Sequence, residues 1–137
     1  MKPRTPPFRL HLDPKSGLPF YRQIVEGVLL AVGDGRLRPG DRLPTSRQTA
    51  VDLSVNPNTV VKAYRELEIR GVLTTQQGVG TFVSDRKPDM GQVERARRLD
   101  GLVEEFLARA AGLGFAPDEV LGALSDRTEP RKEGGRS

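Results

Sequence analysis

Residues 41–84, DRLPTSRQTAVDLSVNPNTVVKAYRELEIRGVLTTQQGVGTFVS, hold the pattern that decides the fold of this chain. Thr45 and Gln48 stand three residues apart, which is the spacing of a capping box at the start of a helix. We therefore predict a short helix over residues 46–53, ended by a tight turn at residues 54–55.

A second helix is predicted directly after that turn. Asn56 is a favourable N-cap, and Pro57 suits the first helical position because its missing N–H would have no partner there. The apolar residues that follow recur on one face until Gly71 ends the run, and they are Val60, Ala63, Tyr64 and Leu67. The helix is predicted over residues 57–70.

Two short β-prone pieces follow, at residues 72–75 and 81–84. The loop between them, at residues 76–80, contains two glycines that permit the positive φ angles of a hairpin turn. We predict a β-ribbon.

Upstream, apolar residues at helical spacing predict an amphipathic helix between Pro19 and Gly33. Alternation of apolar and polar residues over residues 8–12 predicts a short strand with His11 pointing outward. Residues 1–7 are proline-rich with little to bury, so we expect a mobile arm.

These elements predict a mainly α fold with a small β-ribbon: a winged helix-turn-helix, in which the third helix enters the major groove of DNA. That groove, about 12 Å wide, accepts one helix, while neighbouring elements contact phosphates. The apolar residues of the third helix share one face, so Asn58, Thr59, Lys62 and Arg65 are expected on the other.

Composition argues against most other classes of function. The 137 residues include no Cys and one His, so we expect no catalytic residue, no metal site and no cofactor. No apolar run is long enough to cross a bilayer, and we expect a cytoplasmic protein without a membrane partner. Residues 1–86 carry a net charge of +5 and the remainder −1, and the basic excess of the first part favours a polyanionic partner.

A long amphipathic helix is predicted after the ribbon, followed by a shorter one from Pro117 through Leu124. A segment this small has no core of its own, so we expect its apolar stripe to pack against a second copy; packing against the winged domain is the alternative. The stripe consists of Val93, Ala96, Leu99, Val103, Phe106, Leu107 and Ala110.

The predicted domain limits follow from these elements. They are an N-terminal arm and strand at 1–17, a winged helix-turn-helix domain at 18–85, a two-helix dimerisation module at 86–127 and a disordered tail at 128–137.

Three motifs carry a family resemblance: GRLRPGDRLPTSRQ at 35–48, VNPNTVVKAYRELEIRG at 55–71 and GVGTFV at 78–83. In this order and spacing, residues 18–83 closely resemble the DNA-binding domain of GntR-type bacterial transcription regulators. The short segment after the ribbon resembles the tail of the YtrA-type subfamily, which is understood as a dimerisation device. The resemblance implies a transcription regulator, expected to be a repressor, that binds an inverted repeat as a homodimer, often upstream of ABC-transporter genes.

The resemblance also suggests which residues contact DNA. Arg47 matches a DNA-contacting position, and by resemblance the wing tip enters the minor groove. Many family members carry a guanine-reading arginine where this chain has Pro57, so we expect an asparagine at this end of the helix to bond adenine instead. The helix start offers free backbone amides to a phosphate. The full set of candidates is Arg36, Arg38, Arg47, Asn56, Pro57, Asn58, Thr59, Lys62, Gln77 and Gly78.

Two other functions stay open at this point. A fragment of a regulator with an aminotransferase-like, pyridoxal phosphate-binding domain would look similar as far as the wing, but would need hundreds of further residues. An architectural, sequence-neutral DNA-binding protein is the other alternative. No effector is indicated, because neither C-terminal helix shows converging polar groups.

Overall fold

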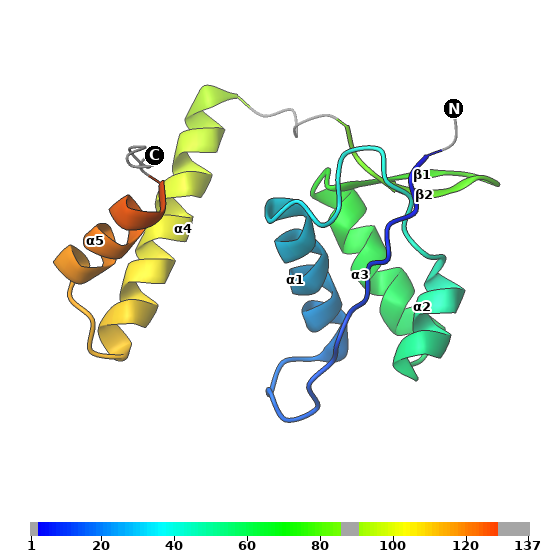
Figure 1. Cartoon of the computed structure of the whole chain (residues 1–137), viewed down its shortest axis with the longest axis horizontal. Coiled ribbons are helices and arrows are strands. Elements are labelled where there is room, and N and C mark those ends of the chain that lie inside the picture. Colours follow the sequence, from blue (N-terminus) through cyan, green and yellow to red (C-terminus); the bar gives the residue numbers. More distant parts are fainter. Residues whose placement is uncertain (1–2, 86–90, 129–137) are drawn as a thin grey trace, which may run out of the picture. The chain divides into compact units, whose positions relative to one another are not determined.

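Residues 3–85 and 91–128 are described by the structure, which is a computed structural model. These ranges contain five helices and one two-stranded sheet, divided between two units, Met1–Asp89 and Met90–Ser137 (Figure 1). The predicted domain limits stay a prediction, because the link between the units at residues 86–90 lies outside the described residues.

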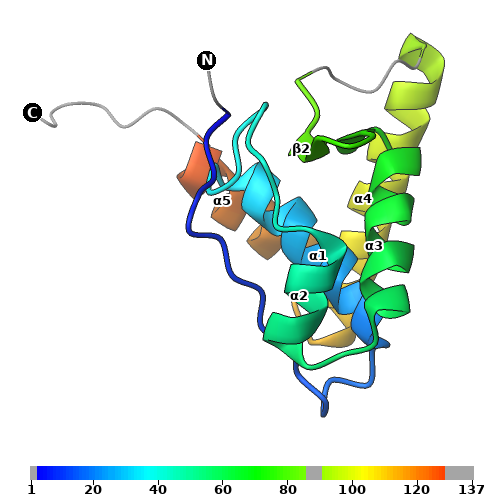
Figure 2. The same cartoon turned by 90° about the vertical axis from the view of Figure 1, so that its right-hand side faces the viewer.

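The first unit is built from three helices: α1 (Phe20–Gly33), α2 (Ser46–Leu53) and α3 (Pro57–Ile69). Helix α3 packs against both α1 and α2 (Figure 2). Each helix buries one face. The largest fully buried side chains of the unit come from α1, from α3 and from the loop between α1 and α2, and they are Ile24, Val25, Val28, Leu37, Leu43, Val60 and Leu67. The predicted winged helix-turn-helix class is confirmed, and the limits of α1, α2 and α3 lie at or within one residue of those expected, whereas the last helix of the chain runs to Thr128 and not to Leu124.

The ends of α2 and α3 are set by local hydrogen bonds. The Thr45 hydroxyl accepts from the Gln48 backbone N–H at 3.0 Å, while the Gln48 side chain accepts from the Thr45 N–H at 2.9 Å. Helix α2 ends at Ser54, whose φ of 58° places it in the left-handed region that reverses the chain. Asn56 then caps α3 and Pro57 starts it.

The wing consists of β1 (Leu73–Gln76) and β2 (Gly80–Val83), paired antiparallel with Leu73 opposite Val83. On its other edge β2 pairs with the segment before α2, through an isolated bridge between Arg42 and Phe82. Backbone bonds from Leu43 N–H to Thr81 O and from Val83 N–H to Asp41 O hold this bridge. The wing is thereby attached to the loop that leads into α2.

The N-terminal segment differs from two predictions. No strand forms at residues 8–12; these residues run extended across the helices, with Phe8, Leu10 and Leu12 half-buried against the core and His11 exposed. Alternation alone does not make a strand, because no neighbouring strand is present to pair with this backbone. The expected mobile arm is also wrong at residue 4, since the Arg42 N–H donates to Arg4 O at 2.8 Å.

The second unit is a helical hairpin of α4 (Gln92–Gly112) and α5 (Pro117–Thr128). Within it, only Ala110 among the described residues is buried. Most of the predicted apolar stripe is exposed on α4. Leu102 on α4, Leu113 and Phe115 in the loop after it, and Leu121 and Leu124 on α5 are exposed as well. Of the predicted tail, residue 128 ends α5, and residues 129–137 lie outside the described residues.

Candidate nucleic-acid interface

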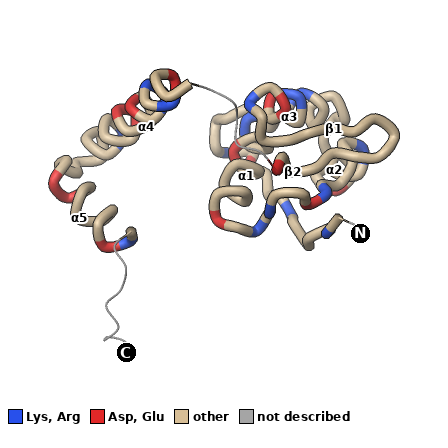
Figure 3. Tube along the Cα trace, turned by 90° about the horizontal axis from the view of Figure 1, so that it is seen from above, with Lys and Arg blue, Asp and Glu red and all other residues tan. Residues whose placement is uncertain are grey.

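The outer side of α3 is polar and exposed. Val60, Ala63 and Leu67 are fully buried on one side of the helix, whereas Asn58 and Arg65 are exposed on the other. Figure 3 marks the basic residues of this unit in blue. Arg65 makes no ion pair with any described residue, so its guanidinium is available to a partner from outside the chain.

The start of α3 is closed by its own cap. Asn56 Oδ1 accepts from the Asn58 N–H at 2.8 Å, the Thr59 N–H donates to Asn56 O at 2.9 Å, and Pro57 has no N–H. The expected free amides at this helix start are therefore largely used within the chain. Contacts here depend on side chains, of which Asn58 is exposed and Thr59 half-buried.

Lys62 lies one turn further along, on the flank that faces α1. Its Nζ is 3.9 Å from the centroid of the Tyr21 ring, a cation–π contact that holds the ammonium group while leaving it exposed. Lys62 is thus placed beside the start of α1, at the edge of the polar side of α3.

Arg47 occupies the first turn of α2 and is exposed. An ion pair with the nearby Asp52 would compete with DNA for this arginine, and no such pair forms among the described residues. Arg47 therefore extends from the capped start of α2 without a partner.

The wing tip carries the two other predicted contacts. Gln77 and Gly78 are exposed in the turn, and Gly78 has φ of +78°, which a glycine adopts without strain. At Gly80, a Cβ atom would lie 2.9 Å from Nε of Arg42, so this arginine lies directly against the wing backbone. Arg42 stays exposed; it lies in the loop before α2 and pairs with β2 at Phe82.

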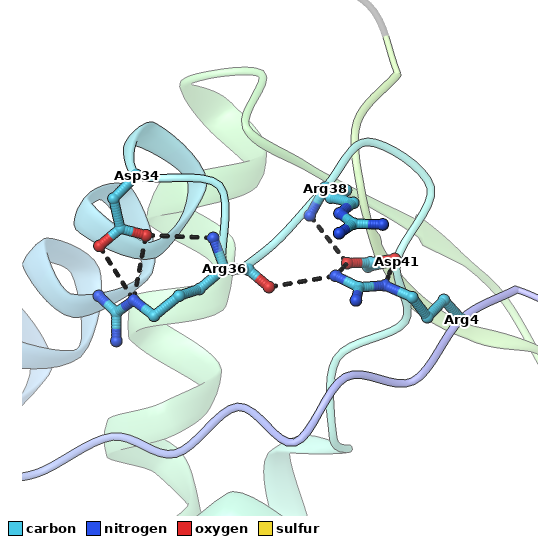
Figure 4. Close-up of polar contacts among 5 residues, drawn as sticks. All are labelled: Arg4, Asp34, Arg36, Arg38 and Asp41. Atoms are coloured by element: carbon cyan, nitrogen blue, oxygen red, sulfur yellow. Dashed lines mark hydrogen bonds and ion pairs between the residues drawn. The ribbon is translucent and has the colours of Figure 1, made fainter. Parts of the chain in front are cut away.

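Arg36 and Arg38, two further candidates for DNA contact, lie in a cluster of charged residues in the loop between α1 and α2 (Figure 4). Nε of Arg36 donates to both carboxylate oxygens of Asp34 at 3.0 Å, and this bond lowers the pKa of Asp34. The Arg38 side chain has no ion-pair partner among the described residues. Of the two, Arg38 is the one whose guanidinium is unpaired.

Asp41 is the centre of that cluster, only 3% exposed. Arg4 donates to its two oxygens at 3.0 and 2.7 Å, and the Arg38 backbone N–H donates at 2.8 Å (Figure 4). The hydrogen bond from Arg4 is the main cause of the lowered pKa of Asp41, with Arg38 adding to it against the opposing effect of burial. Arg4 thus fixes the N-terminal segment to the loop beside the wing.

A buried hydroxyl pair holds α2 against α3. The Tyr64 hydroxyl donates to Pro44 O at 2.9 Å and lies 3.1 Å from the Thr49 hydroxyl. Burial raises the pKa of Tyr64, and the bond to Thr49 opposes that shift. These bonds join α3 to α2 and to the residue that precedes the cap of α2.

Sequence reasoning missed Val61, which is exposed within the polar side of α3. Its place was readable from the helical pattern, since it follows Asn58 by three residues. The partner of Asp41 was not readable, because Arg4 lies 37 positions away. In residues 3–85 and 91–128 no group of His and acidic side chains is arranged to hold a metal ion, and no helix could span a membrane.

Comparison with known proteins adds independent evidence. The model of a family described as bacterial regulatory proteins, gntR family, matches residues 20–83. The chain is 42% identical over 76 residues to the HTH-type transcriptional repressor YtrA of Bacillus subtilis, a match that spans 56% of this chain and 58% of that relative. It is 41% identical over 116 residues to the HTH-type transcriptional regulator Rv1152 of Mycobacterium tuberculosis, across 85% of this chain and 91% of that relative.

A solved structure resembles the whole chain at the level of the fold. The transcriptional antiterminator of Listeria monocytogenes superposes with a TM-score of 0.72 at 30% identity, covering 89% of this chain and 91% of that one. The similarity therefore extends beyond the winged unit to the helical hairpin.

Proposed function

This chain belongs to the GntR family of bacterial regulatory proteins and is a DNA-binding regulator of the YtrA type. We propose that it is a repressor and that it binds an inverted-repeat operator as a homodimer. Its relatives are named as transcriptional regulators, and the chain is not an enzyme. One observation carries the proposal: the polar side of α3 is exposed and largely unpaired, while its apolar side is fully buried.

We assign base reading to Asn58 and phosphate binding to the basic residues around it. An asparagine amide can bond adenine N6 and N7 in the major groove, a pairing worth about 1–3 kcal/mol of discrimination. Arg47 and Lys62 lie on α2 and on the α1 side of α3, where cations fix the register of the helix by contacting phosphates. The remaining candidates flank these positions, and they are Arg36, Arg38, Asn56, Pro57, Thr59, Gln77 and Gly78.

The homodimer rests on the apolar surface of the hairpin. Val93, Leu99, Val103 and Phe106 recur along one side of α4 and are exposed, while ion pairs such as Arg98–Glu94 and Arg109–Glu105 lie within the helix elsewhere. Beside α5, a groove of about 500 Å³ is lined mainly by apolar side chains, including those of Phe106 and Phe115. A second copy would cover the apolar residues of this surface, and the two charged residues that also line the groove, Glu119 and Arg127, are of opposite sign.

The DNA contacts are tested by footprinting the full chain on the DNA upstream of its own gene and measuring affinities for the protected site. We expect Asn58→Ala to relax the base preference at one position of each half-site. Arg47→Ala and Lys62→Ala should instead weaken binding to all sequences and reduce the salt dependence by about one phosphate contact each.

Arg97→Ala, on α4, is the matched control and should bind like the wild type. If the Arg47 and Lys62 variants together left the affinity unchanged, α3 would not be the DNA-binding helix. If excess random DNA displaced the wild-type protein from its site, the sequence-neutral alternative would replace a specific regulator. By resemblance to the subfamily, the protected DNA should precede genes for an ABC-type transporter.

The dimer is tested with charges placed on the two sides of α4. Leu99→Glu and Phe106→Glu should convert the protein to monomers in sedimentation at micromolar concentration, because an unpaired carboxylate would be buried in the interface. Ala108→Glu adds the same charge on the opposite side of the helix and should leave the dimer intact. A wild-type protein that sediments as a monomer would refute this part of the proposal.

A further inference from the structure

The recognition helix carries one large apolar side chain in the part that would enter the major groove. Val61 lies in the second turn of α3 and is 38% exposed. Isolated exposed valines are common on protein surfaces, so exposure by itself carries no argument. The argument rests instead on the position of Val61 between two polar side chains of α3.

Val61 follows Asn58 by three residues and precedes Arg65 by four, so the three side chains form one strip along α3. Pro57, also exposed, lies one turn before Val61 on the same side. This side of α3 does not pack into the core of the first unit, because the buried residues in the same two turns of α3 are Val60, Ala63 and Tyr64. The strip therefore combines an amide, an apolar patch and a guanidinium.

We propose that Val61, extended by Pro57, contacts the C5-methyl group of a thymine, and so makes this protein specific for a T one or two base pairs from the base that Asn58 reads. This inference rests on the proposed function. In the major groove the base edges present hydrogen-bond donors and acceptors, and thymine adds an apolar C5-methyl group. Apolar side chains recognise this methyl group. Polar groups on either side of Val61 would hold it at base level rather than against the sugar-phosphate backbone.

The spacing fits neighbouring base pairs. Side chains three residues apart on a helix are about 5–6 Å apart, and successive base pairs are about 3.4 Å apart along the duplex. The thymine contacted by Val61 therefore lies one or two steps from the adenine bonded by Asn58. Burying a single methyl group corresponds to roughly a fourfold gain in affinity.

The test uses DNA that differs only in methyl groups. Binding sites are selected from random duplexes with the full-length protein, and each thymine of the selected site is then replaced by deoxyuridine. For the wild type we expect roughly a fourfold loss of affinity at one thymine in each half-site. Val61→Ala should lose most of the discrimination between the thymine and uracil sites, while retaining the preference for adenine at the Asn58 position.

Val51→Ala is the matched control, because it truncates an exposed valine of α2 and should keep the thymine preference. Both valines are exposed, so the variants should keep the melting temperature of the wild type. If uracil has no effect at any position, or if Val61→Ala distinguishes uracil from thymine as strongly as the wild type does, the inference is wrong. If no preferred site is selected at all, it is the proposed function that fails.

Discussion

At the scale of single residues, polar side chains of this protein act in two distinct settings. Asn58 and Arg47 are exposed and unpaired among the described residues, as binding residues should be. Asp41 is buried and receives three hydrogen bonds, from Arg4 and from the Arg38 backbone, so it joins segments far apart in the sequence. Replacing an exposed binding side chain changes the free energy of unfolding little. Replacing a buried one such as Asp41 leaves a buried donor or acceptor without its partner and lowers that free energy.

Asp41→Asn is therefore expected to lower the free energy of unfolding by about 1–3 kcal/mol at pH 7, because a charged hydrogen-bond acceptor is lost from a buried site. The lowered pKa of Asp41 fixes the pH dependence. Its contribution is complete above the ordinary pKa of an aspartate, about 4, and is lost as the pH falls through the lower pKa of the folded protein.

Denaturant unfolding from pH 7 to pH 2 measures this difference, which should shrink as the acid limit is approached. Asp34→Asn is the control: its carboxylate is also paired with an arginine, but is half exposed, and the variant should melt close to the wild type. A difference between wild type and Asp41→Asn that does not depend on pH would rule out the ion pair as its source.

At the scale of elements, the N-terminal segment packs across α1 and determines which residue α1 can carry at the contact. Gly27 lies in the interior of α1, where alanine would favour helix formation. A Cβ atom there would come within 2.5 Å of Leu10 Cδ2, so the glycine makes room for the N-terminal segment. That segment is thus packed into the first unit, although it forms no strand.

Gly27→Ala is expected to destabilise the protein by about 1 kcal/mol, because the cost of displacing Leu10 exceeds the gain in helix propensity. In a Leu10→Ala background the same change should become stabilising, since the obstacle is gone. Gly33→Ala, at the end of α1 with open space around it, is the control and should be neutral or stabilising. Thermal unfolding of the four variants measures these effects; a stabilising Gly27→Ala in the wild-type background would contradict the packing of Leu10.

At the scale of the whole molecule, burial is divided unequally between the two units. Apart from Ala110, every buried apolar residue that the structure describes belongs to the first unit. The hairpin instead keeps large apolar side chains such as Leu102 and Leu113 exposed. A unit with its own core can fold alone, whereas one without a core depends on a partner.

A fragment of residues 1–89 is accordingly expected to unfold in one cooperative step, with a melting temperature that does not depend on protein concentration. The full chain should melt at higher temperature as concentration rises, because dimerisation stabilises the folded state by mass action. Calorimetry over a hundredfold range of concentration distinguishes the two. An unfolded fragment would mean that the first unit needs the hairpin for stability.

Much of the fold was predictable because its signals are local. The capping box at Thr45, the cap at Asn56 and the glycines of the wing act over two to five residues, and the structure forms each of these features as expected. The alternation at residues 8–12 predicted a strand wrongly, because it too is only a local signal. It records which side chains are buried, while a strand also requires a neighbour, which no local pattern supplies.

The sequence by itself determined the order of elements, the side of each helix that is buried and the residue types on the polar side of α3, because helical periodicity and capping need only near neighbours. The tertiary structure alone decided that Arg4 binds Asp41, that Leu10 fills the space over Gly27, and that Lys62 lies over Tyr21. Each of these contacts joins residues that are distant along the chain, and they meet only because the helices pack together into a common core.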